Sequence, residues 1–213
     1  MASTQDERIK TASKNRRERQ KAETRQAILD AASELFLEKG YENFSLRQVA
    51  EQIGYSPGTI YLYFSDRDAL LFTLADEGFQ RFGRMLQATV ESSDNPREQL
   101  IAMGEGYVDF GLNNPVHYRL MFLERPDFMM RERPDSDEPD TWADTFMILH
   151  RCVERAMEQD VIEKDDPRTV SDAIWAMLHG VVALGIRMPH VDDDRTQQAA
   201  DKIRRVMNRG LFL

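Results

Sequence analysis

Apolar residues recur at helical spacing along most of the chain, and no part of the pattern predicts a strand. Between residues 21 and 39 they fall on one helix face, and Gly40 then supplies a residue suited to ending a helix. Ser45 begins a second apolar pattern that stops at Gly54, and Ser56 with Pro57 begins a third, shorter one. The pattern predicts three helices in the first third of the chain.

Six further helices are predicted after Ser65. Proline suits the first position of a helix, and it stands at 96, 115 and 167, whereas acidic residues follow Ser65 in the first predicted turn. Two more helical patterns cover residues 141–159 and 196–209. Residues 124–140 hold three prolines among ten charged residues, which predicts a mobile loop. The chain is therefore predicted to be all-α, with about nine helices.

Charge is distributed unevenly along the chain. The net charge is -9, but residues 1–67 hold 11 Lys and Arg against 10 Asp and Glu, whereas residues 68–213 hold 17 against 27. Residues 8–21 contain seven basic residues and one acidic residue. We predict that residues 1–20 form a flexible basic arm that follows nucleic-acid phosphates, and a merely solubilising tail is the alternative.

Residues 45–64, SLRQVAEQIGYSPGTIYLYF, followed by SDRDAL, resemble the helix-turn-helix of the TetR (tetracycline repressor) family. The similarity runs from about Ala22 to Leu74 and includes ILDAA at 28–32 and LFLEKGY at 35–41. It implies a three-helix DNA-binding head over residues 21–67 and a helical bundle for ligand binding and dimerisation over residues 68–213. The function it implies is a repressor that a small molecule releases from palindromic operator DNA.

The resemblance also implies which residues of the head meet DNA. Phosphate contacts are expected at the helix N-termini assigned to Thr24 and Ser45, and at Tyr61, Tyr63 and Arg67. Base edges are expected nearest to Arg47, Ser56, Gly58 and Thr59. Pro57 lies on the same surface, although it and Leu62 stand where Lys or Arg is common in the family.

A ligand pocket in the second domain is a further implication of the resemblance. The side chains expected to line it are Phe82, Met85, Met103, Tyr107, Phe110, His117, Met121, Phe122, Trp142, Phe146, Trp175 and His179. Their mostly apolar character predicts a hydrophobic or aromatic effector, and ordinary core packing is the alternative for each. Trp175 with His179 and Gly180 is similar to the Trp-His-Gly ligand domain of one subgroup.

Residues 173–186 are apolar almost all round, so a helix there needs cover on both sides. One bundle covers one side, and we therefore predict a homodimer. The expected interface residues are Gly180, Ala183, Leu184, Ala199, Ala200, Ile203, Val206 and Met207. The family resemblance then implies two recognition helices about 34 Å apart, the spacing of successive major-groove turns.

The residue types give little support to catalysis. The four histidines form no pair four residues apart, and Cys152 lies two residues from His150, which points the two side chains apart on a helix. We predict no metal, no cofactor and no enzymatic activity. With no signal peptide and no run of about 18 apolar residues, a cytoplasmic location without a membrane partner is expected. A transcriptional activator, or a ligand-binding bundle that has lost DNA recognition, remains the alternative.

Overall fold

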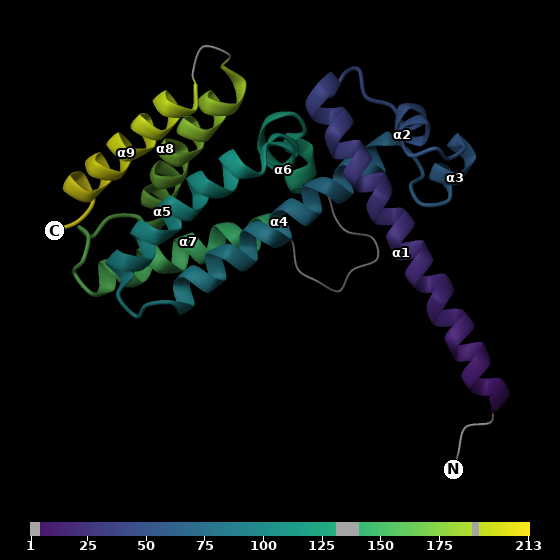
Figure 1. Ribbon diagram of the computed structural model, residues 1–213. Coiled ribbons are helices and arrows are strands. Elements are labelled where there is room, and N and C mark those ends of the chain that lie inside the picture. The colour runs from purple at the N-terminus through teal and green to yellow at the C-terminus, as the bar shows by residue number, and fades with distance from the viewer. Residues whose placement is uncertain (1–4, 131–140, 189–191) are drawn as a thin grey trace. The chain divides into compact units, whose positions relative to one another are not determined.

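The computed structural model describes residues 5–130, 141–188 and 192–213, except for the side chains of 5–9, 130, 141–143 and 193 (Figure 1). These residues form nine α-helices and no β-strand, which confirms the predicted all-α class. The chain divides into two compact units, residues 1–74 and 75–213. The boundary falls inside one long helix, α4 (Arg67–Glu91).

The first unit contains α1 (Gln5–Lys39), α2 (Leu46–Gln52), α3 (Pro57–Tyr61) and the start of α4. Gly40 and Gly54 have φ of +73° and +71°, so each ends a helix in the left-handed region that favours glycine. Ser45 caps α2 by accepting a hydrogen bond from the Gln48 amide, as the sequence predicts. The fully buried core includes Ile28, Phe36, Val49, Ile60 and Leu70.

Helix α1 is longer than the apolar pattern predicts. Its described course begins at Gln5, so residues 5–20 are helical where the sequence analysis expects a flexible arm. Residues 10–20 are mostly polar and all exposed, and ion pairs one turn apart support the helix: Lys14 with Glu18 at 3.8 Å and Arg19 with Glu23 at 3.1 Å. An apolar stripe is therefore not what holds the first turns of α1 helical.

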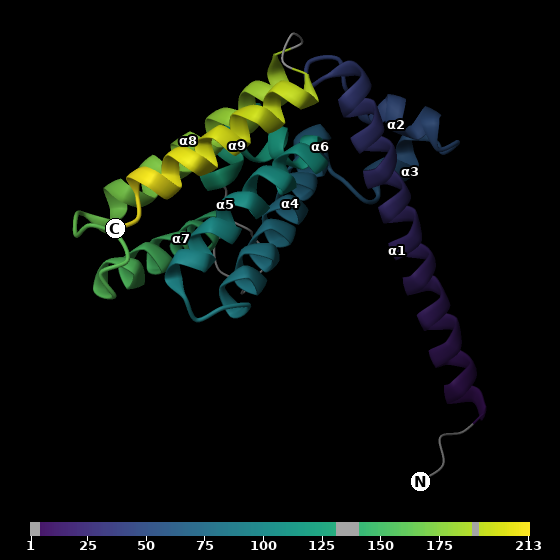
Figure 2. The ribbon, with the colours of Figure 1, turned by 60° about the vertical axis from the view of Figure 1, so that its left-hand side comes forward.

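The second unit is a bundle in which α5 (Pro96–Asn113) is central. Helix α5 contacts α6 (Pro115–Tyr118), α7 (Thr141–Glu158), α8 (Pro167–Arg187) and α9 (Asp193–Gly210). Helices α8 and α9 contact each other and lie side by side in both views of the ribbon (Figures 1 and 2). Asn95 and Asp166 cap α5 and α8, each directly before the proline that begins the helix.

Helix α6 passes into a π-helical turn at Arg119–Leu123 and then into a short 3₁₀ turn at Pro126–Met130. Within the 3₁₀ turn Phe128 is buried, and the Arg125 guanidinium lies 4.1 Å from its ring centroid. The rest of the predicted loop, residues 131–140, lies outside the described residues.

Two glycines allow close contact between helices of the second unit. A Cβ atom on Gly78 of α4 would lie 2.6 Å from Sδ of Met121 and 2.9 Å from Cβ of His117. A Cβ atom on Gly185 of α8 would lie 2.6 Å from Cγ2 of Thr196 on α9. Real Cβ atoms do not approach so closely, so both helix contacts depend on the absence of a side chain.

Helix α8 differs from the expectation that no segment is apolar enough to cross a membrane. Among the described residues it is the one helix with the length and composition for a membrane span, a test that the core helix of a soluble protein also passes. One face, with Ile174, Leu178 and Val182, is buried in the bundle. The opposite face leaves Met177 and Leu184 exposed, so part of the apolar surface of α8 lacks cover within one chain.

Candidate functional site

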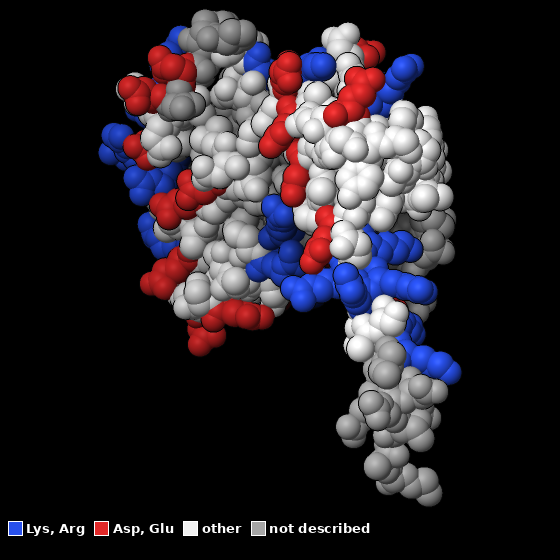
Figure 3. Space-filling view, turned by 45° about the vertical axis from the view of Figure 1, so that its right-hand side comes forward, with Lys and Arg blue, Asp and Glu red and all other residues white. Residues whose placement is uncertain are grey.

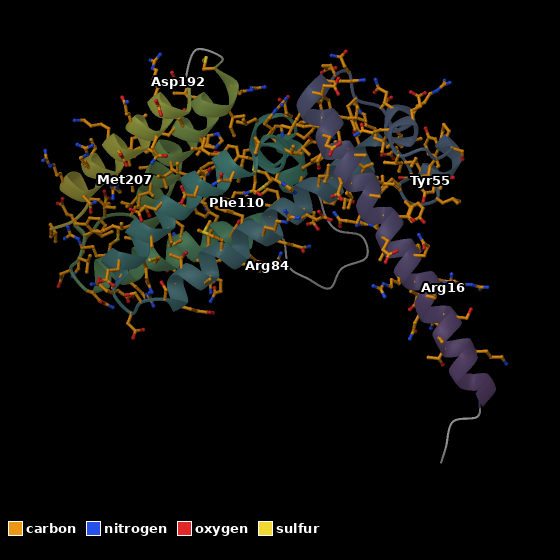
Figure 4. The ribbon with its side chains drawn as sticks, viewed as in Figure 1. Arg16, Tyr55, Arg84, Phe110, Asp192 and Met207 are labelled. Atoms are coloured by element: carbon orange, nitrogen blue, oxygen red, sulfur yellow. The ribbon has the colours of Figure 1, made fainter. Side chains whose placement is uncertain are left out.

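The helix-turn-helix presents a continuous exposed surface on α3 and the turn before it. Ile60 is fully buried and anchors α3, whereas Ser56, Pro57 and Gly58 are exposed and Tyr61 is 57% exposed. Tyr55, labelled in Figure 4, lies in the turn and is also exposed. An aromatic ring as exposed as Tyr61 contributes little to the core, so the structure leaves it available to another molecule.

The other candidates of the head differ in how free their side chains are. Arg47 is exposed on α2 and its Nε atom lies 3.5 Å from a Glu51 carboxylate oxygen, a surface ion pair that another anion can replace. Arg67 is held more firmly, because its guanidinium lies 4.4 Å from the ring centroid of Tyr41 and donates to the Tyr41 carbonyl. Tyr63, Thr59 and Ser45 are half-buried.

The resemblance implies that Thr24 lies at a helix N-terminus, and this is wrong. Helix α1 begins at Gln5, well before Thr24. Its side chain is 6% exposed, and its hydroxyl donates to the Gln20 carbonyl at 2.9 Å. The extended helix α1 therefore turns this residue from a terminal position into an interior one.

Gly58 has no structural need to be glycine. A Cβ atom there would meet only Ser56 Oγ, at an ordinary 3.7 Å. A methyl group at this position would therefore fit without a collision in the described structure. This property distinguishes Gly58 from Gly78, whose Cβ would collide with buried atoms.

The first half of α1 adds positive charge to this unit. Its described basic residues are all exposed: Lys10, Lys14, Arg16, Arg17, Arg19 and Lys21. Figure 3 shows a cluster of Lys and Arg side chains, in blue, on one face of the molecule. Arg16, labelled in Figure 4, extends away from the helix axis. Exposed cations along a helix attract polyanions in a salt-dependent way.

A small inner cavity lies in the second unit, between α4, α5, α7 and α8. It is lined mostly by apolar groups and has a free volume of about 30 Å³, room for a water molecule and far less than an organic ligand occupies. Five predicted pocket residues line it: Phe82, Met103, Tyr107, Phe146 and Trp175. The sequence analysis missed Leu86, Leu100, Gly104, Thr145, Leu149, Ile174 and Leu178. An ordinary core pattern gives no sign of which of its members border free space.

Two predicted pocket residues extend the aromatic packing around this cavity. The Phe110 ring packs 5.1 Å from Phe82, and Phe122 lies 6.4 Å from Trp175, both measured between ring centroids. The side chain of Trp142 lies outside the described residues.

Three other predicted pocket residues pack against glycines of neighbouring helices. Met85 packs against Gly106, and Met121 and His117 pack against Gly78. The Nε2 atom of His117 is buried without a hydrogen-bond partner among the described residues, and burial, aided by Arg81, lowers its pKa to about 4. None of these three side chains lines the cavity.

A buried hydrogen-bonded cluster borders the inner cavity. The Tyr118 hydroxyl lies 2.9 Å from the Tyr107 hydroxyl and 2.7 Å from Nδ1 of His179, and Trp175 Nε1 donates to the Tyr107 hydroxyl at 3.1 Å. Burial raises the pKa of both tyrosines and lowers the pKa of His179. All three groups therefore stay neutral near pH 7. Tyr118, fully buried, joins the cluster although the sequence analysis assigned it no site role.

The predicted interface residues lie on two adjacent helices. On α8, Leu184 is 51% exposed and Gly180 borders open space. On α9, Val206 is 51% exposed, and Ala199 is exposed as well. Ala183, Ala200, Ile203 and Met207 are half-buried. Met207 is labelled on α9 in Figure 4.

Two family models match this chain. "Bacterial regulatory proteins, tetR family" matches residues 28–74, and "Tetracyclin repressor-like, C-terminal domain" matches residues 100–207. A curated relative, an uncharacterized HTH-type transcriptional regulator of Haemophilus influenzae, is 31% identical over 106 residues, which make up 49% of this chain and 52% of the relative. The match thus spans about half the length of that relative.

Solved structures show the same fold. The TetR family transcriptional regulator PfmR from Thermus thermophilus superposes with a TM-score of 0.68 at 21% identity, over 87% of this chain and 99% of that chain. The ketosteroid transcriptional regulator KstR2 of Mycobacterium tuberculosis gives 0.67 at 16% identity, over 89% and 95%. With both halves matched by family models, the chain belongs to the TetR family of bacterial transcriptional regulators.

Proposed function

We propose that this protein is a homodimeric transcriptional repressor that binds palindromic operator DNA and is released by a small, apolar effector. The observation that carries the proposal is the exposed surface of α3, where Tyr61 stands free and Gly58 is open to close approach. A helix with such a surface fits the major groove, and Arg47 on α2 is placed to contact bases or phosphates.

Dimerisation is supported by the uncovered apolar faces of α8 and α9. Leu184 and Val206 are half exposed on neighbouring helices, and Gly180 leaves space for a second helix to approach. Two helices from each subunit would form a four-helix interface. A two-fold symmetric dimer presents two copies of α3, which accounts for a palindromic operator.

The inner cavity supports an apolar effector. Its lining includes no charged residue, and its free volume of about 30 Å³ is too small for an organic ligand without rearrangement. An effector must therefore enlarge it, which gives binding a conformational consequence. The structurally similar KstR2 is named a ketosteroid regulator, and ketosteroids belong to the same hydrophobic class.

DNA binding is tested by selecting duplex DNA from a random-sequence pool with the purified protein and measuring the affinity of enriched sequences by mobility shift. We expect a palindromic sequence whose affinity falls as salt is raised. The Arg47→Ala variant should weaken binding by about 1–3 kcal/mol, as expected for a lost base contact. The Tyr61→Ala variant should also weaken binding, because it removes an expected phosphate contact. Arg84→Ala, which removes an exposed arginine of the second unit (Figure 4), is the matched control and should retain full affinity.

The outcomes separate the alternatives. A pool that yields no enriched sequence would overturn DNA recognition and favour a ligand-binding bundle. Equal losses in Arg47→Ala and Arg84→Ala, with none in Tyr61→Ala, would show that general charge and not the α2 and α3 surface binds DNA. A reporter gene placed behind the selected operator then distinguishes repression, our expectation, from activation.

A further inference from the structure

Two cavities of the second unit share a wall. The inner cavity is the apolar one described above, and an outer cavity of about 290 Å³ lies between α5, α8, α9 and the C-terminal residues. Leu100, Gly104 and Leu178 line both. The outer cavity is larger than the inner one, and its lining includes Ala200 and Met207, two of the residues predicted for the subunit interface.

The shared wall is thin at Gly104. A Cβ atom on Gly104 would lie 3.7 Å from Cδ2 of Leu178, so the leucine side chain covers the glycine. The atoms nearest to a Cβ at Gly104 are both side-chain atoms of Leu178, and no backbone atom is among them. Rotation of a leucine side chain between staggered rotamers requires no movement of the helices. Leu178 is therefore a movable side chain that separates the two cavities at this point.

The outer cavity carries acidic charge. Its lining includes Glu105, Asp109, Asp201 and Arg204, a formal charge of -2. The Arg204 guanidinium lies 3.2 Å from Glu105 and 3.5 Å from Asp201, so its own charge is already balanced by these carboxylates. A cationic group in this cavity would gain from the remaining negative charge, whereas an anionic group would be repelled.

The inner cavity offers the opposite chemistry. Its lining residues are uncharged, and the hydroxyl of Tyr107 is already bonded to Tyr118 and Trp175. A charged or strongly polar group placed there would lose its hydration without a new partner. An alkyl or aromatic group has no strong hydration to lose and would gain apolar contact.

We infer that the two cavities are chambers of one amphipathic ligand site, in which Leu178 turns aside to admit an apolar tail and the acidic outer chamber holds a cationic head. The inference rests on the proposed effector binding and names the ligand class: an organic amine or ammonium compound with an apolar tail. Gly104 carries no side chain that would fill the space beside Leu178.

The test uses three probes that share a ten-carbon tail: decylamine, decanol and decanoate. Their affinities for the full-length protein are measured by isothermal titration calorimetry without DNA, at pH 7 and concentrations below micelle formation. We expect decylamine to bind at least tenfold more tightly than decanol and decanoate to bind most weakly. Equal affinities for the amine and the alcohol, or preference for the carboxylate, would overturn the cationic assignment.

Variants test each chamber separately. Glu105→Gln with Asp109→Asn should reduce the preference for the amine over the alcohol at least fivefold, whereas Glu158→Gln, an exposed acid outside both cavities, should leave it unchanged. Gly104→Leu should weaken all three probes at least tenfold by blocking the passage, and Leu178→Phe provides a second block if the first variant folds poorly. Unaltered binding in both blocked variants would overturn the two-chamber site.

The readouts also separate this inference from the proposed function. Selective decylamine binding that leaves operator affinity unchanged would support the site and refute effector release. Loss of operator binding with another apolar compound, but no selectivity for the amine, would refute the site and leave effector release standing.

Discussion

Replacing Tyr118 by Phe removes one hydroxyl from a fully buried ring and keeps the packing of that ring. The Tyr118 ring centroid lies 4.9 Å from that of Phe122 and 6.0 Å from that of Tyr107, and phenylalanine can retain both contacts. What is lost is the pair of hydrogen bonds, 2.9 Å to the Tyr107 hydroxyl and 2.7 Å to Nδ1 of His179. The substitution therefore isolates the energetic contribution of the cluster.

The expected cost follows from what remains satisfied. Tyr107 keeps its bond from Trp175, whereas His179 Nδ1 is left with only the longer 3.4 Å contact to Tyr107. Leaving one buried polar atom poorly paired costs about 1–3 kcal/mol. We expect Tyr118→Phe to lower the free energy of unfolding of the second unit by this amount, which is large beside the stability of a typical domain.

Urea denaturation followed by far-ultraviolet circular dichroism measures the change. All variants are compared at one protein concentration, because dimerisation would make the midpoint depend on concentration. Tyr61→Phe, which removes a hydroxyl from a ring that is 57% exposed, is the control and should change stability by less than about 0.5 kcal/mol. If Tyr118→Phe is as stable as the parent, the cluster contributes no net stability and the reasoning is refuted.

Three further predictions concern packing, pH and assembly. Gly78→Ala should destabilise the protein by about 1–3 kcal/mol in urea titrations, because the methyl group collides with Met121, whereas Gly58→Ala has room and should not. Burial holds the pKa of His117 at about 4, below the ordinary value of 6.5, so the unfolded chain binds protons that the folded one resists. Urea midpoints should therefore fall as pH drops from 6.5 toward 4, less so in His117→Gln; an equal fall in both proteins would contradict this origin. Leu184→Glu should convert a dimer to monomers in sedimentation velocity runs, while Leu62→Glu, equally a change of an exposed leucine, should not.

The features that the sequence predicts well are those that local residues determine. Ser45, Ser56 and Pro57 mark the starts of α2 and α3 because a cap and its amide partner lie within three residues. The predicted start of α1 is wrong because its first turns have no apolar stripe. The contact of Tyr118 with His179 joins positions 61 residues apart, and nothing in the apolar pattern indicates it. Likewise, the apolar pattern includes Leu178 but gives no sign that this residue borders a cavity.

The inner cavity and the hydrogen-bonded cluster share two side chains, and under the proposed function these side chains would couple effector binding to the cluster. Tyr107 and Trp175 line the cavity and are bonded to each other, and Tyr107 is bonded in turn to Tyr118 at the end of α6. A ligand too large for about 30 Å³ must push against these rings. If it displaces Trp175, the bond to Tyr107 breaks, and the cluster must either find new partners or shift α6 with it. A ligand changes a conformational equilibrium only through different affinities for the two states. The small cavity with an intact cluster and the expanded cavity with an altered cluster are two such states. We therefore expect substitutions at Tyr118 to change effector affinity, although Tyr118 does not line the cavity.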